Sequence, residues 1–114
     1  MKIVTRMQND HATVRVEGSL SNENLQELEK KLGAALSKRK HLLLDLGEMT
    51  FICSAALGMM LDYNRKYSAG RLRFVLCNPR DDIRKLFVIT ELHKHLAIFN
   101  SAAEALSHIR DRAP

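Results

Sequence analysis

The chain has 114 residues, enough for one hydrophobic core, so we expect a single domain over residues 1–114. Hydrophobic residues make up 46 % and charged residues 27 %, a globular balance that argues against disorder. The aromatic content of 5 %, without tryptophan, argues against a stacking platform for bases or sugars.

The net charge of +5 would attract nucleic acid or an anionic membrane. However, the one run of three basic residues, Lys38 to Lys40, stands where a helix is predicted to end, and cations are favoured at that position. We therefore expect a mildly basic, solvated surface and no direct contact with nucleic acid.

The first elements along the chain predict a β-hairpin followed by a helix. Residues 2–7 form a short strand, and residues 11–17 alternate apolar and polar side chains after a turn at Asn9 and Asp10. Gly18 is expected to break the second strand. Ser21 and Asn22 are good N-cap residues for an amphipathic helix over residues 22–37.

Residues 42–46, LLLDL, form a nearly continuous apolar run, which predicts an interior strand buried on both faces. Residues 47–51 are interpreted as the connection to a helix that begins at Ser54 and ends near Gly70. A strand over 72–77, a helix over 80–89, a strand over 96–99 and a final helix capped by Ser101 follow.

The order β-β-α-β-α-β-α-β-α predicts an α/β fold. We expect a mixed sheet of four to five strands, an opening hairpin followed by βα units, and helices mainly on one face. In open sheets of this kind, function collects at the carboxyl ends of the strands. That rule indicates residues 47–54 and the start of the following helix.

The most informative segment is residues 42–61, LLLDLGEMTFICSAALGMML. Ser54 stands at the predicted start of a helix, where unpaired N–H groups and a partial positive charge accommodate a phosphate. Read from the residues alone, Ser54 is an N-cap whose hydroxyl satisfies the first turn.

From about Ile3 to Ile109 the chain resembles a STAS domain, the fold of bacterial anti-sigma factor antagonists. That family typically has a buried strand, an acidic residue after it, then Phe-Ile-Asp-Ser-Ser-Gly-Leu-Gly and an apolar helix. The matching residues here are Asp45, Phe51, Ile52, Ser54, Leu57 and Gly58. Supporting matches are VRVEGSL in the second strand, LCNP at a strand end and SAAEAL in the last helix.

The resemblance implies a regulatory binding protein and not an enzyme. In the family, a serine at the position of Ser54 is phosphorylated by a partner that is both a serine kinase and an anti-sigma factor. The unphosphorylated antagonist binds this partner and releases the sigma factor, and a phosphatase reverses the modification. We expect the partner-binding surface to comprise Ser21, Asn22, Phe51, Cys53, Ser54, Ala55, Leu57, Gly58 and Met59. The sequence leaves open whether the protein forms a dimer.

Three residues depart from the family pattern: Cys53 replaces the acidic residue, Ala55 a second hydroxyl residue and Ala56 a glycine. These departures favour an alternative, a STAS adaptor in a transport or signalling assembly that does not use phosphorylation. A third interpretation is an enzyme with a Cys53 or Ser54 nucleophile, but no histidine is placed by the sequence to activate either group.

The remaining candidates indicate structure rather than chemistry. Cys53 and Cys77 stand in apolar stretches without metal or CxxC spacing, which predicts buried or half-buried thiols. His93 and His95 have no evident third ligand, so a surface pair is favoured over a metal site. We expect no cofactor, no membrane insertion, because signal-like and membrane-spanning runs are lacking, and a cytoplasmic location.

Overall fold

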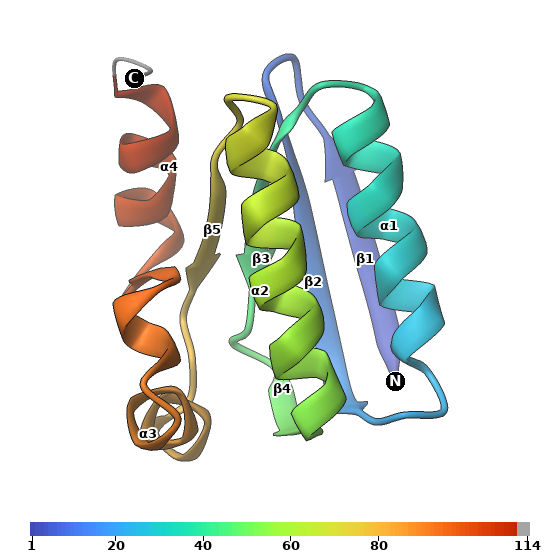
Figure 1. Cartoon of the computed structure of the whole chain (residues 1–114), viewed down its shortest axis with the longest axis vertical. Helices are drawn as coiled ribbons and strands as arrows, with labels where there is room; N and C mark the ends of the chain where they lie inside the picture. Colours follow the sequence, from blue (N-terminus) through green and yellow to red (C-terminus); the bar gives the residue numbers. More distant parts are fainter. Residues whose placement is uncertain (112–114) are drawn as a thin grey trace.

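The computed structural model describes residues 1–111, which form a mixed sheet with helices on both faces (Figure 1). The strands are β1 (Lys2–Met7), β2 (His11–Leu20), β3 (His41–Asp45), β4 (Met49–Ile52), β5 (Phe74–Cys77) and β6 (Ala97–Phe99). The helices are α1 (Leu25–Ser37), α2 (Ser54–Ala69), α3 (Asp81–Ile89) and α4 (Ala102–Arg110), with a short 3-10 helix η1 (Leu92–Lys94). The predicted α/β fold with a mixed sheet is confirmed.

The sheet has the strand order β1-β2-β3-β5-β6. β1 and β2 pair antiparallel as the predicted hairpin, and every other neighbouring pair is parallel. β3 lies inside the sheet, and Leu42, Leu43 and Leu44 are each at most 2 % exposed. The prediction of an interior strand buried on both faces is therefore confirmed.

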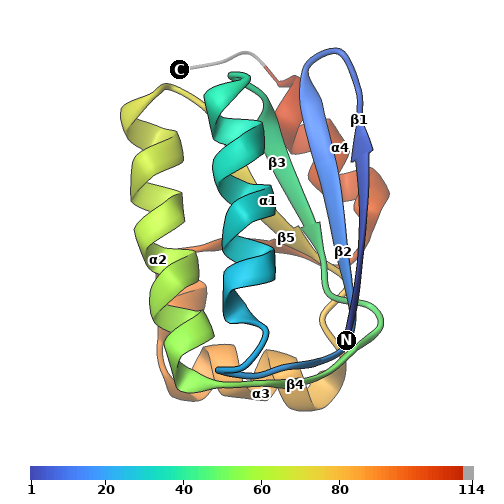
Figure 2. The ribbon, with the colours of Figure 1, turned by 90° about the vertical axis from the view of Figure 1, so that its right-hand side faces the viewer.

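Helices cover the two faces of the sheet unequally (Figure 2). α1 and α2 lie on one face, over the larger core cluster. α4 lies on the other face, where Ala105 and Ile109 pack against Leu43, Val75 and Cys77. Strands that are apolar on both faces need cover on both, which is why the last helix crosses to the side away from α1 and α2.

Strand β2 is longer than the sequence predicts. Gly18 does not end the strand; it adopts a φ of 94° beside a register shift, and β2 continues to Leu20. A positive φ costs glycine little, so the strand bends there without breaking. The residues beyond Gly18 pair in parallel with β4. The segment interpreted as a connection thus contains a sixth strand.

The predicted cap of α1 is wrong. Neither Ser21 nor Asn22 caps the helix, because α1 begins later and its N-cap residue is Asn24. The Asn24 side chain serves the preceding turn instead, accepting the Ser21 N–H at 2.8 Å and donating to the Ser19 carbonyl at 3.0 Å. The cap of α4 is confirmed, since Ser101 Oγ accepts an N–H from the first turn at 3.2 Å.

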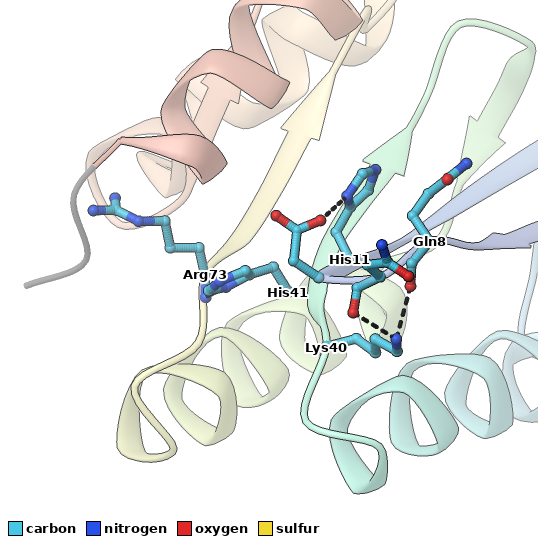
Figure 3. A network of polar contacts seen from close by, with 7 residues as sticks. Gln8, His11, Lys40, His41 and Arg73 are labelled. Atoms are coloured by element: carbon cyan, nitrogen blue, oxygen red, sulfur yellow. Dashed lines mark hydrogen bonds and ion pairs between the residues drawn. The ribbon is translucent and has the colours of Figure 1, made fainter.

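The basic run at residues 38–40 is used inside the fold. Lys40 Nζ donates to the carbonyl oxygens of Gln8 and Asn9, each at 2.7 Å, and so holds the hairpin turn (Figure 3). Arg39 Nη2 donates to the Gly70 carbonyl oxygen at the end of α2 at 2.8 Å. These contacts favour a structural role for the run.

His41 belongs to the same polar end of the sheet and joins β3 to the start of β5. Its Nδ1 accepts the backbone N–H of Arg73 at 2.9 Å, so that nitrogen carries no proton. Burial lowers the pKa of His41 below its ordinary value of 6.5, and the charges of Arg73 and His11 lower it further, while Asp10 opposes them.

This arrangement predicts a loss of stability in mild acid. The folded protein binds fewer protons at His41 than the unfolded chain does, so the contribution of His41 is complete above pH 6.5 and is lost as the pH falls below it. Urea unfolding between about pH 7 and about pH 5 should show the decline. His41→Asn keeps an acceptor near Nδ1 but does not titrate, and it should flatten the decline. His95→Asn, which removes an exposed histidine, serves as the control and should keep the decline of the wild type. If His41→Asn showed the same decline as this control, the assignment to His41 would be contradicted.

Candidate functional site

Strand β4 carries the chain to the start of α2. Met49 and Ile52 are buried and anchor the strand, whereas Phe51 between them is 53 % exposed. At the end of the strand, the Cys53 N–H donates to the Leu20 carbonyl oxygen at 3.0 Å. This backbone bond fixes the residue that precedes α2 to the end of β2.

Ser54 is the first residue of α2, and the N-cap is Cys53, whose backbone is extended. The interpretation of Ser54 as a capping residue is therefore wrong: Ser54 is already helical, so the helix starts one residue earlier than a Ser54 cap requires. Within residues 1–111, the Ser54 side chain is exposed and its hydroxyl makes no hydrogen bond. This hydroxyl is therefore accessible from solvent.

The start of α2 is electrically uncompensated. The helix has 16 residues, no acidic residue in its first turn and no side-chain cap. Its first N–H groups and its partial positive charge therefore face the Ser54 side without a neighbouring anion on the same turn. A phosphate on Ser54 would find a favourable local field there.

An open groove of about 790 Å³ lies between the start of α2, β4 and α3. Its lining combines residues from four parts of the chain: Asn22, Thr50, Phe51, Ile52, Cys53, Ser54, Ala55, Leu57, Asp82, Ile83, Leu86 and Thr90. Figure 2 shows α3 beside β4 at the end of the molecule where α2 begins. No histidine is among the lining residues described, so neither nucleophile candidate gains a base there.

The groove brings together six of the nine residues that are predicted for partner binding: Asn22, Phe51, Cys53, Ser54, Ala55 and Leu57. The other three lie outside its lining. Ser21 is half-buried, and Gly58 is exposed with nothing within 4 Å of its Cβ position. Met59 is half-buried and packs against the core rather than standing free.

The α3 wall of the groove is absent from the sequence prediction. Its residues Asp82, Ile83, Leu86 and Thr90 follow β5, nearly thirty residues after Ser54. The sequence could have indicated this wall only through the topology of the sheet. β3 and β5 are parallel neighbours, so the segments that follow their carboxyl ends meet at one edge of the sheet.

Asp45, the residue that matches the acidic position of the family, does not line the groove. Its Oδ1 accepts the Gly47 N–H at 2.9 Å and a weaker bond from Asn78 Nδ2 at 3.4 Å. Asp45 thus stabilises the turn between β3 and β4, and it contributes to the site only through the conformation of this turn.

Comparison with known proteins identifies the fold family. The STAS domain family model matches residues 2–105. The chain belongs to the STAS domain family. Within residues 1–111, no helix is both long and apolar enough to cross a membrane.

Similar proteins include named anti-sigma factor antagonists. BtrV of Bordetella bronchiseptica is 26 % identical over 100 residues, which are 87 % of this chain and 86 % of that protein. A Thermotoga maritima structure of the same designation superposes with a TM-score of 0.86 at 22 % identity, over 95 % of this chain and 94 % of the other.

The antagonist SpoIIAA has the same fold. Its unphosphorylated form gives a TM-score of 0.82 at 20 % identity, over 99 % of this chain and 100 % of the other. Its phosphorylated form, from Bacillus, gives 0.74 at 20 % identity, over 96 % and 100 %. The STAS fold implied by the resemblance is confirmed.

The two cysteines of the protein should differ sharply in reactivity. Cys53 is half-exposed in the groove, whereas Cys77 is buried, and burial together with the charge of Asp45 raises the pKa of Cys77 to about 12. Ellman's reagent at about pH 8 should therefore modify one thiol in the folded protein and the second only after denaturation. Cys53→Ala should remove the fast reaction. Loss of the fast reaction in Cys77→Ala instead would contradict this assignment.

Proposed function

We propose that this STAS domain is an anti-sigma factor antagonist that binds an anti-sigma factor of the serine-kinase type, and that phosphorylation of Ser54 switches this binding. One observation carries the proposal. Ser54 presents an exposed hydroxyl without a hydrogen bond at the start of α2, inside a groove with a largely apolar lining.

The switch follows from the electrostatics of the groove. A phosphate on Ser54 adds about −1.5 to −2 charges at neutral pH. The start of α2 has no acidic residue in its first turn, so the free antagonist tolerates this charge. A partner that covers the groove must strip water from the phosphate, in a groove whose lining already includes the carboxylate of Asp82. Phosphorylation therefore opposes docking, and a phosphatase restores it.

The family departures leave the geometry of the motif in place. Cys53 anchors the start of α2 through its backbone N–H, which needs no carboxylate. Ala56 is fully buried, where a good helix former suits the first turn. What the departures remove is one charge and one hydroxyl. Their removal favours a second candidate function, a STAS adaptor that binds its partner without a phosphorylation switch.

The two candidate functions differ in the effect of charge at Ser54. Against a purified serine-kinase anti-sigma factor from the same organism, Ser54→Ala should bind like the wild type. Ser54→Asp should bind at least about tenfold more weakly, because its charge must be desolvated under the partner. Thermal unfolding should differ little between the variants, since the start of α2 accepts an anion. Isothermal titration calorimetry measures the affinities.

Ser107→Asp provides a matched control, because it adds the same charge on the exposed side of α4, on the opposite face of the sheet. It should leave the affinity unchanged. Equal affinities for Ser54→Asp and Ser54→Ala would exclude Ser54 as the switch and would favour the adaptor.

A further inference from the structure

We infer that helix α3 forms the second half of the partner-docking surface, and that its exposed apolar face receives an apolar ridge on the partner. This inference rests on the proposed function and extends it to residues outside the family motif. The face consists of Leu86, which lines the groove, and Ile89, which is 77 % exposed.

The packing of α3 fixes which side of the helix faces the groove. Ile83 and Phe87 are 4 % and 0 % exposed and insert into the core, so the helix cannot rotate freely. Leu86 and Ile89 are three residues apart and share one side of the helix. Val88 is also exposed, at 51 %, but it is two residues from Leu86 and lies on a different side.

Exposed apolar side chains concentrate at this end of the molecule. Of the five large hydrophobic side chains exposed within residues 1–111, three belong to β4 or α3: Phe51, Val88 and Ile89. Phe51 from β4 and Leu86 from α3 line the groove together. An apolar ridge seated in the groove would bury both walls at once, and a concentration of this kind marks a binding surface.

The charges of the chain indicate what flanks this ridge. Asp82 is the one carboxylate among the described lining residues, and it stands in the first turn of α3, where its Oδ1 accepts the Ile83 N–H at 2.9 Å. Lys85, one helical turn before Ile89, is exposed beside the apolar face. The whole chain carries +5, which disfavours a second copy, and the exposed Lys85 favours a partner with an acidic side chain at that edge of the ridge.

The test compares two similar aliphatic truncations on one helix. Ile89→Ala and Val88→Ala each remove an exposed β-branched side chain, and neither disturbs the buried residues of α3. Titrated against the serine-kinase anti-sigma factor used for the Ser54 variants, Ile89→Ala should lose about tenfold or more in affinity, whereas Val88→Ala should stay within about twofold. Ser54→Asp is measured in parallel, and sedimentation velocity records the oligomeric state of each variant.

The outcomes separate this inference from the proposed function. Weaker binding by Ser54→Asp with wild-type affinity for Ile89→Ala would overturn the role of α3 and leave the switch standing. Equal losses in Ile89→Ala and Val88→Ala would overturn the groove-facing assignment. A wild-type dimer that Ile89→Ala dissociates would show that a second copy occupies the groove and would also overturn the inference. Loss in Ile89→Ala with no effect of Ser54→Asp would support α3 docking and contradict the switch.

Discussion

Strand β2 pairs in parallel with two different strands in succession, and the functional end of the molecule depends on this double pairing. Its first half is bonded to β3, and after the bend at Gly18 its last residues are bonded to β4. The Cys53 N–H adds the final bond, to the Leu20 carbonyl oxygen. Without the second pairing, residues 49–53 would be a loop and the direction of α2 would not be fixed. The sheet therefore fixes the position of the first residue of α2.

At this end of the sheet, the residues that stabilise the fold differ from those proposed to bind a partner. The core residues of α2 and α3 point inward, so the exposed side chains at Ser54 and Ile89 can change without opening the core. The field of α2 favours an anion on Ser54 in the free protein, whereas a covering partner opposes it. In the proposed switch, phosphorylation of Ser54 would therefore have opposite effects on the free and bound states.

Much of this fold is predictable because its patterns are local. The alternation in the hairpin, the apolar run of β3 and the spacing of Ser101 and Glu104 each identify an element by themselves. β4 is not predictable in this way, because its exposed Thr50 and Phe51 are adjacent and break the alternation. The bulge at Gly18 and the α3 wall depend on pairing between distant segments. The start of α2 at Ser54 is predictable from the sequence, whereas its N-cap at Cys53 is seen only in the structure.

Site-specific phosphate mapping tests the central claim most directly. The protein would be incubated with a serine-kinase anti-sigma factor from the same organism and ATP, and its peptides would then be analysed by mass spectrometry. The account predicts one phosphate per chain, on Ser54, and no incorporation into Ser54→Ala. Phosphate on another residue, or no phosphate in a mixture where the two proteins bind, would contradict it.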